Sequence, residues 1–170
     1  AVALDRELFA TSDTPRTMAS RLLDAALALA RRQPVPAVSL VHAWQVYGAE
    51  LLDDPSSGLA AEESARYVDS QRYSHTLWLE EMHAALRDRA VAAGLQALET
   101  TTVLLEGAPD VVIADWLARA DIDTLILGNT GTSAAPGLFI GSTAEAILSH
   151  CGQSVLTVKA QDFRSPVLSR

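Results

Sequence analysis

The sequence predicts an α/β fold with three layers, in which helices cover both faces of an open, doubly wound, parallel sheet of five strands. Short apolar runs alternate along the chain with segments of helical periodicity, and strands that alternate with helices pair in parallel through right-handed crossovers. The run Thr124–Leu127 is apolar without interruption, which suits a strand that is covered on both faces. These two observations carry the fold prediction.

The strands are expected at five short runs that are apolar or rich in β-branched residues. They are Ala1–Leu4, Ala37–Trp44, Thr101–Leu105, Thr124–Leu127 and Ser154–Lys159. Polar or glycine-bearing segments separate these runs from the helices, as expected where strands end. Ala1 already lies within its apolar run, so we expect sequence upstream of this chain, which can include a further domain.

Four helices are expected between the strands, at Thr17–Arg32, Ala60–Ala93, Pro109–Arg119 and Thr143–Ser149. In the first, apolar residues recur at helical spacing, Thr17 suits the N-cap, and Pro34 and Pro36 end the helix. The second is long and amphipathic, and Gly94 suits its end. The third buries one short apolar face, and the fourth ends before Gly152.

Length and composition indicate one globular domain, residues 1–160, followed by a polar tail, residues 161–170. Of the 170 residues, 49% are apolar, which is enough for a substantial core. The net charge of -8 argues against binding to nucleic acid or to an anionic membrane. We expect neither a membrane span nor a signal peptide. Cys151 is the only cysteine, so we expect a reducing, cytoplasmic location.

Three of the predicted strands end in segments that suit a ligand. In doubly wound sheets, ligands bind at the carboxyl ends of the strands, where the strand order reverses. Asp5 follows the first strand, His42 lies near the end of the second, and the segment Gly128–Gly141, which we call the glycine loop, leads on from the fourth. The sequence therefore places a ligand site at this edge of the sheet.

The glycine loop connects a strand to a helix, an arrangement that directs several backbone N–H groups at one point. Glycine lets a ligand approach the backbone closely, and the N-terminus of a helix attracts phosphate. Ser142 and Thr143 add hydroxyl groups, but the loop has no lysine and lacks the spacing of a P-loop or a dinucleotide fingerprint. A structural alternative stays open, in which Ser142 and Glu145 form a capping box and the glycines make a turn.

The spacing of these residues resembles the ATP-binding signature of the universal stress protein family. That signature is Gly-x2-Gly-x9-Gly followed by Ser or Thr, here Gly128, Gly131, Gly141 and Ser142. As in the family, an apolar helix and a final strand ending in Val-Lys follow, and the order of elements matches over nearly the whole chain. The resemblance implies a Rossmann-like fold of the adenine nucleotide alpha hydrolase type. The last part of the chain resembles the C-terminal domain of members that carry two such domains.

The resemblance implies a site for ATP with a divalent ion such as Mg²⁺. On the base and ribose side, Asp5 would contact the nucleoside, Ala43 would line the adenine pocket, and Leu127 would pack on the base. The chain departs from the family after Asp5, where Arg6 stands in place of the usual small or aromatic residue.

On the phosphate side, the resemblance implies that Gly128 and Gly131 admit the triphosphate. Gly141, Ser142 and Thr143 would donate hydrogen bonds to it. Here too the chain departs from the family, because threonines flank the second glycine where a histidine and a basic residue are common. The charge of the phosphates would then have to be met by N–H groups, hydroxyl groups and a metal ion.

Other candidate sites have simpler explanations. His75 and His83 share the long helix, but a spacing of eight does not place metal ligands on adjacent turns, so we expect a solvated helix face. His42 lies in an apolar strand and is expected to be a core residue with satisfied hydrogen bonds. No Ser-His-Asp arrangement or pair of carboxylates is placed for catalysis. We expect no enzyme activity beyond slow ATP hydrolysis.

Two functions from different classes stay open. The first is a stress-response or signalling module that binds ATP and changes its affinity for partners as the loops beside the site become ordered. The second is an interaction domain of the same fold that holds no ATP and acts by pairing of domains or by binding another phosphorylated or apolar ligand. An ATP pyrophosphatase or nucleotidyl transferase is disfavoured, because no serine- and glycine-rich pyrophosphate loop follows the first strand.

The last predicted strand, Ser154–Lys159, is expected at one side of the sheet. An unpaired apolar edge favours association with a partner. The resemblance implies pairing through this strand, either in a homodimer or between two domains of one chain. We therefore predict association through Ser154–Lys159.

Overall fold

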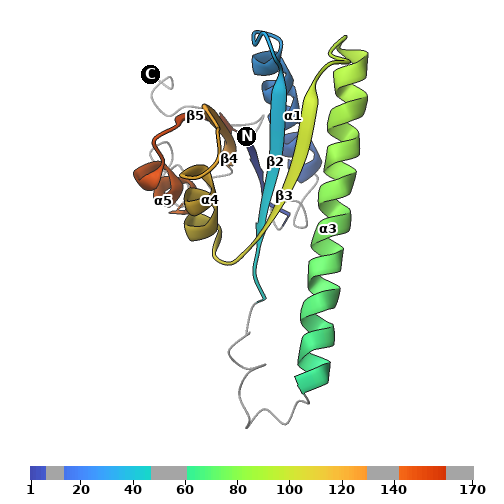
Figure 1. Ribbon diagram of the computed structural model, residues 1–170, viewed down its shortest axis with the longest axis vertical. Helices are drawn as coiled ribbons and strands as arrows, with labels where there is room; N and C mark the ends of the chain where they lie inside the picture. Colours follow the sequence, from blue (N-terminus) through green and yellow to red (C-terminus); the bar gives the residue numbers. More distant parts are fainter. Residues whose placement is uncertain (7–13, 47–60, 130–141, 160–170) are drawn as a thin grey trace, which may run out of the picture.

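Five strands hydrogen-bond in the order β3-β2-β1-β4-β5, and every neighbouring pair runs parallel. The computed structural model describes residues 1–6, 14–46, 61–129 and 142–159 (Figure 1). The strands are β1 (Val2–Leu4), β2 (Ala37–Trp44), β3 (Glu99–Glu106), β4 (Thr124–Asn129) and β5 (Ser154–Lys159). This sheet confirms the predicted doubly wound α/β fold.

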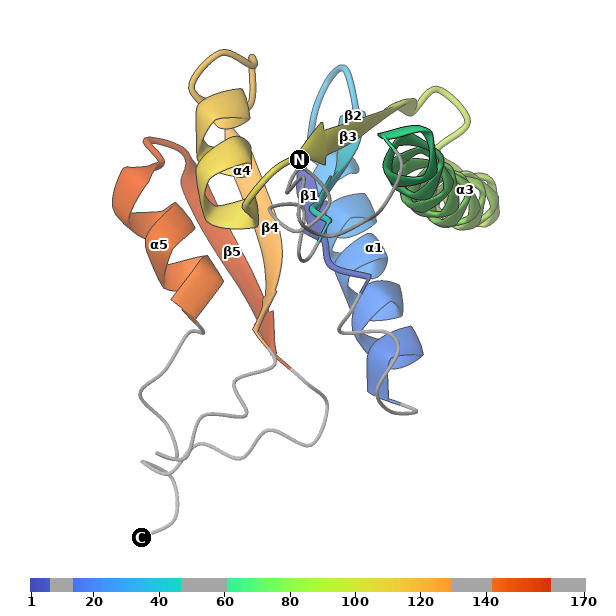
Figure 2. The same cartoon turned by 90° about the horizontal axis from the view of Figure 1, so that it is seen from below.

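The helices lie in two layers, one on each face of the sheet (Figure 2). They are α1 (Thr14–Ala30), α3 (Ala61–Ala92), α4 (Pro109–Leu117) and α5 (Ser142–His150). Helices α1 and α3 cover one face and bury one apolar cluster, and α4 and α5 cover the other face and bury a second. Among the described residues, no helix is both long and apolar enough to cross a bilayer.

Neighbouring residues of β2 show how both faces are buried. Leu40 and Val41 are each 0% exposed, yet Leu40 packs in the cluster under α1 and α3, whereas Val41 packs in the cluster under α4 and α5. Side chains alternate between the faces of a strand, so a strand covered on both sides needs an apolar residue at every position. The continuous apolar runs in the sequence follow from this requirement.

Helix α3 ends at a glycine, as the sequence predicts. Gly94 has φ +76°, and its N–H donates to the Val91 carbonyl, while the Leu95 N–H donates to the Ala90 carbonyl. This pair of hydrogen bonds is a Schellman motif, which satisfies carbonyl groups that the helix leaves without partners. The motif turns the chain toward β3.

Most predicted elements differ from the structure by one or two residues at an end, and two differences are instructive. Thr17 is not the N-cap of the first helix, because α1 already begins at Thr14 and holds Pro15 in its first turn, where a proline costs no hydrogen bond. Strand β3 is longer than predicted and pairs with β2 along its whole length, from Glu99 to Glu106. Its polar ends lie at one side of the sheet, where the sequence signal for a strand is weak.

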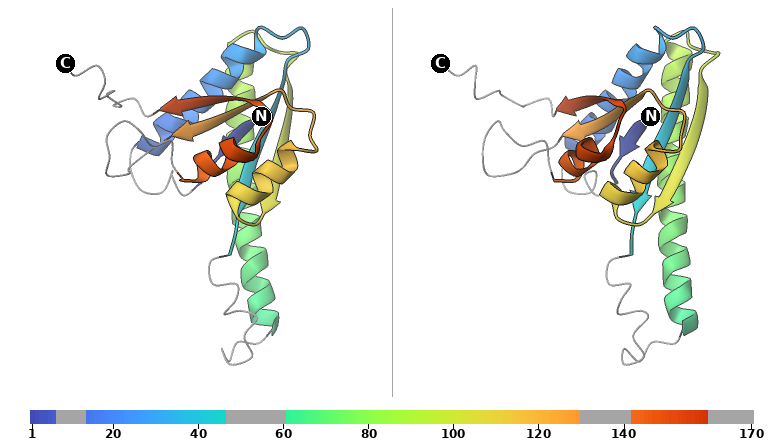
Figure 3. Two further views of the ribbon diagram at one scale, coloured as in Figure 1. Left: turned by 90° about the vertical axis from the view of Figure 1, so that its left-hand side faces the viewer. Right: turned by 60° about the vertical axis from the view of Figure 1, so that its left-hand side comes forward.

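Helix α3 extends past the carboxyl ends of β2 and β3 (Figure 3). Arg72 of this helix forms an ion pair of 2.7 Å with Glu106, the last residue of β3. The first turns of α3 therefore lie beside the edge of the sheet at which the sequence predicts the ligand site.

Candidate functional site

The strand order reverses between β1 and β4. The chain runs outward from β1 to β2 and β3, and then crosses to β4 on the other side of β1. Ala3 is in register with Leu127, so Asp5 and Asn129, two residues further along, are at the same level. Ligands of doubly wound sheets bind at such a reversal. We call this region the switch edge, formed by the carboxyl ends of β1, β2 and β4.

At the switch edge β2 runs further than β1. Its pairing with β1 ends where His42 is opposite Leu4, but its pairing with β3 continues to Trp44. The Trp44 carbonyl accepts a hydrogen bond from the Gly107 N–H on the β3 side. Carbonyl groups alternate in direction along a strand, so the Ala43 carbonyl is directed to the β1 side, beyond the last β1 residue. It can accept a hydrogen bond from an amino group there.

Two polar residues follow β1 at the switch edge. Asp5 is exposed, and Arg6 is half-buried. A carboxylate at this position can accept hydrogen bonds from hydroxyl groups such as those of a ribose, or can contribute one ligand to a hard cation. The structure therefore brings Asp5 and Ala43 to the same edge, as the sequence predicts.

Leu127 and Gly128 end the described apolar part of β4. Leu127 is 4% exposed, and its side chain packs in the apolar cluster under α4 and α5. A Cβ at Gly128 would lie 3.4 Å from both Cγ and Sδ of Met18 in α1. This is close to an ordinary van der Waals contact with a flexible side chain, so the packing of α1 on β4 does not by itself require glycine at this position.

The phosphate side of the predicted site is described only in part. Gly131 and Gly141 lie outside the described residues. Ser142 is the first residue of α5, and Thr143 is exposed in its first turn. The N-terminus of α5 carries backbone N–H groups without helical partners, which is the chemistry that favours an anion.

A pair of histidines close to the switch edge is a feature that the sequence analysis missed. His42 is 2% exposed, its Nδ1 lies 3.0 Å from the Leu4 carbonyl oxygen, and its Nε2 lies 2.8 Å from Nδ1 of His75. The prediction that His42 is a satisfied core residue is confirmed. The prediction that His75 lies on a solvated helix face is wrong. Its side chain is half-buried against His42 and Trp44. No signal in the sequence links these two residues, which are 33 positions apart.

The hydrogen bonds of this pair fix the positions of the protons. A carbonyl oxygen only accepts, so Nδ1 of His42 carries a proton and donates it to Leu4. Nε2 of neutral His42 then accepts, and Nδ1 of His75 must be the donor. Burial is the main cause that lowers the pKa of His42, to about 4, and the charge of Arg6 also lowers it. The pKa of His75 is lowered as well, mainly by burial and to a smaller extent by the charge of Arg6.

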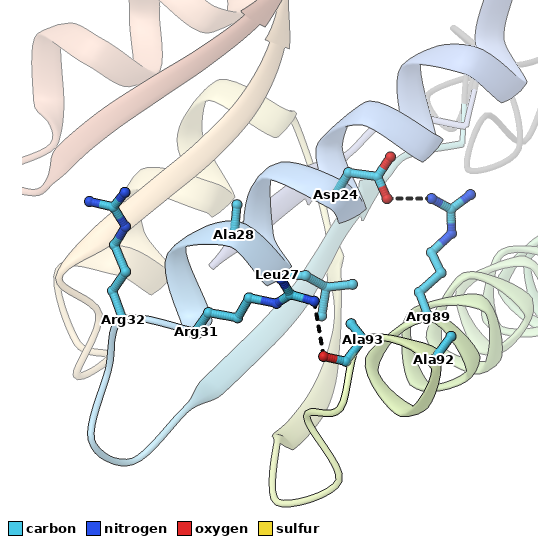
Figure 4. A pocket seen from close by; sticks show the side chains of 8 residues that line it. All are labelled: Asp24, Leu27, Ala28, Arg31, Arg32, Arg89, Ala92 and Ala93. Atoms are coloured by element: carbon cyan, nitrogen blue, oxygen red, sulfur yellow. Dashed lines mark hydrogen bonds and ion pairs between the residues drawn. The ribbon is translucent and has the colours of Figure 1, made fainter.

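A hollow of about 590 Å³ lies between α1 and α3, near the carboxyl ends of both helices (Figure 4). Its arginines hold the two helices together. Arg89 of α3 contacts Asp24 Oδ1 and Ser20 Oγ of α1, each at 2.6 Å, and Arg31 donates to the Ala93 carbonyl oxygen at 2.9 Å. The hollow is separate from the switch edge, and its polar contacts have a structural explanation. Among the described residues, no three His, Cys, Asp or Glu side chains converge as a metal-ligand set.

Comparison with known proteins assigns the family. A family model described as "Universal stress protein family" matches residues 8–159, which is most of the chain. The chain belongs to the universal stress protein family. The relative "Universal stress protein MJ0531" of Methanocaldococcus jannaschii is 28% identical over 116 residues, which cover 68% of this chain and 65% of that protein. The family assignment agrees with the resemblance carried by the glycine signature.

"Universal stress protein E" of Escherichia coli K12 is 29% identical over 69 residues, 41% of this chain. This match spans 22% of the length of that relative. Among solved structures, "Universal stress protein UspA from Lactobacillus plantarum" is similar with a TM-score of 0.60 and 16% identity, covering 92% of this chain and 94% of that chain. At this identity the likeness shows the fold, which is that of a universal stress protein.

Proposed function

We propose that this universal stress protein chain binds ATP, together with a divalent ion, at the switch edge, and that it acts as a stress-response or signalling module with little or no catalysis. The reversal of strand order between β1 and β4 carries the proposal. It gathers the Asp5 carboxylate and the Ala43 carbonyl beside the end of β4, the strand that leads through the glycine loop to α5. A base, a ribose and a phosphate chain each meet suitable chemistry there.

A divalent ion fits this site as a companion of the nucleotide. Mg²⁺ is often held by one or two carboxylates plus the phosphates of a substrate, and Asp5 is the carboxylate at this edge. The ion would supply positive charge to the phosphates. Apart from the His42–His75 pair, no described group at the edge is placed as a general base with a partner to orient it, and the proposal includes no fast hydrolysis.

Binding of ATP would act on partners by changing the surface around the glycine loop. A ligand shifts a conformational equilibrium by its difference in affinity for the two states. Phosphate contacts from the backbone of this loop would favour one arrangement of the loop. The chain's affinity for a partner at this surface would then depend on ATP.

Titration calorimetry of ATP with Mg²⁺ tests the proposal. We expect saturable binding by the native chain and loss of that binding in Gly131→Ala and Gly141→Ala, because a Cβ would obstruct contact between phosphate and backbone. Gly152→Ala is the matched control, since an added Cβ there meets nothing within 4 Å. Absence of binding by the native chain contradicts the proposal, and so does equal loss of binding in the control.

One observation favours the second function, an interaction domain without ATP. Among the described residues, strand β5 is at one side of the sheet and pairs with β4 alone, and Leu156 in this strand is 38% exposed. An open strand edge can pair with a second copy or another domain. This function predicts association of the chain without any effect of nucleotide.

A further inference from the structure

We propose that Arg6 is the cation of the switch edge and contacts the phosphate groups of the bound nucleotide. The inference rests on the proposed function and names the group that meets the ligand's charge.

Arg6 lies at the carboxyl ends of β1 and β4. It follows β1 by two residues, and the register of β1 and β4 puts it one residue past the level of Asn129. The side chain is half-buried. A long, flexible arginine at this position can reach across the ends of β1 and β4.

Among the side chains that the structure describes, the other basic groups near the switch edge do not supply this charge. The glycine loop contains no lysine, arginine or histidine, and the chain as a whole has a net charge of -8. His42 and His75 are hydrogen-bonded to each other as neutral imidazoles. Arg72 is paired with Glu106 at 2.7 Å, and Lys159 is one strand further out, in register with Asn129. A polyanion therefore needs a local cation to overcome the field of an acidic protein.

Within the part of the chain that the structure describes, Arg6 makes no hydrogen bond or ion pair. Its charge acts instead on the two histidines, and it lowers the pKa of each. Burial removes water from a charge, and no described side chain compensates Arg6 for that loss. An anion at the switch edge would supply that group.

The guanidinium group selects phosphate. Its planar fork donates two parallel hydrogen bonds to two oxygens of one phosphate, which gives both geometry and strength. The adenosine part of the ligand offers Arg6 no comparable anion. Arg6 is therefore expected to contribute to the affinity for ATP and not to that for adenosine.

The first test compares the affinities of ATP and adenosine. We expect Arg6→Gln to weaken ATP binding by about tenfold or more and to change adenosine binding by less than about twofold, and Arg6→Lys to recover part of the loss. Lys159→Gln and Arg87→Gln, the latter at an exposed position near the end of α3, are matched controls, and both should bind ATP within about threefold of the native chain. Native ATP affinity in Arg6→Gln overturns the inference. So does an equal loss for adenosine, or a larger loss in Lys159→Gln.

The second test uses His75 as a reporter of the charge on Arg6. Because Arg6 lowers the pKa of His75, a phosphate that neutralises Arg6 should raise this pKa. NMR titration of the His75 ring should show a higher pKa with ATP bound in the native chain, and no such change in Arg6→Gln. An unchanged His75 pKa in the ATP-bound native chain contradicts the proposed contact.

Inorganic tripolyphosphate separates this inference from the proposed function. If the native chain binds tripolyphosphate and Arg6→Gln does not, Arg6 is a phosphate-binding residue even where ATP fails to bind. If ATP binds equally well to both chains, the proposed function stands and the Arg6 inference is wrong. If the native chain binds neither compound, both are wrong.

Discussion

His42 shows how one polar side chain is accommodated in an apolar sheet. Both ring nitrogens have partners, the Leu4 carbonyl at 3.0 Å and His75 at 2.8 Å, and the ring packs edge-on against Trp78 with centroids 4.8 Å apart. Protonation of Nε2 would place a second proton against the donor of His75. Burial and this hydrogen-bond geometry together keep His42 neutral.

We predict that acid destabilises the protein through His42. Its pKa is about 4 in the folded protein and 6.5 as the reference for the unfolded chain, so only the unfolded chain takes up the proton between these values. The stability that neutral His42 contributes is fully present above pH 6.5. As the pH falls from 6.5 to 4, the unfolding free energy decreases by about 3 kcal/mol.

Urea denaturation at a series of pH values measures this effect. The loss of stability between pH 6.5 and 4 should be smaller in His42→Leu than in the native chain. His150→Gln, at an exposed position in the last turn of α5, should keep the native dependence. Identical pH dependence in His42→Leu and in the native chain would show that His42 does not titrate as described.

The predicted site residues differ in how far the sequence could place them. Asp5 was placed at the switch edge because it follows an apolar run, and parallel strands place such ends at one edge, whereas the role of Ala43 came from the family resemblance. His75 could not be found in this way. Its contact with His42 depends on where a 32-residue helix crosses the sheet, which local pattern does not determine. The same limit applies to the half-buried position of Arg6.

At the scale of elements, α1 and α3 are joined by side chains as well as by their apolar faces. Arg89 contacts Asp24 (Figure 4) and also Ser20 across the two helices, at 2.6 Å in each case. The Arg89 side chain is 37% exposed, less than that of an ordinary surface arginine such as Arg66, which is 74% exposed in its pair with Glu62. Lower exposure and a second acceptor make the Arg89 contacts the stronger set.

We predict that Arg89→Ala lowers the unfolding free energy by about 1 kcal/mol, because it removes hydrogen bonds and an ion pair between helices. Arg66→Ala, which removes a pair within one exposed helix, should cost less than about 0.5 kcal/mol. Chemical denaturation of the two variants gives the comparison. A cost for Arg66→Ala that equals or exceeds the cost for Arg89→Ala would contradict this account.

Some boundaries of the helices and strands are determined by the local sequence, and others by contacts with another element. Strands Ala37–Trp44 and Ser154–Lys159 were predicted to the residue, because apolar or β-branched residues fill each between clear turn signals. The ends of β3 were not, since Glu99 and Glu106 become strand residues only by pairing with β2. The helix beginning at Thr14 likewise exceeds its apolar pattern by three polar residues.

In the whole molecule, as far as the structure describes it, the sheet has two outer sides at which a strand has a neighbour on one side alone. Strand β5 forms one and β3 the other, and the prediction that Ser154–Lys159 is at one side of the sheet is confirmed. Leu156 is 38% exposed in β5, while the neighbouring Val155 and Val158 pack partly against the two apolar clusters. This side offers both backbone groups and apolar surface to a partner.

We predict that the chain associates through β5. Sedimentation should give a mass above that of a monomer for the native chain, and Leu156→Glu should shift the equilibrium to monomer, because a charge at the centre of the strand would be buried on association. Val111→Glu is the control, at a 54% exposed position of α4. A native chain that stays monomeric at high concentration would contradict the prediction.

The measurement that tests the central claim most directly is an amide NMR map of ATP binding in the presence of Mg²⁺. We expect the amide signals of Asp5, Ala43 and Gly128, at the ends of β1, β2 and β4, to shift in a saturable way as ATP is added. Asp121 and Gly152, which precede β4 and β5 at the opposite edge, should not shift. Shifts confined to the opposite edge, or no saturable shift at all, would show that the switch edge does not bind ATP.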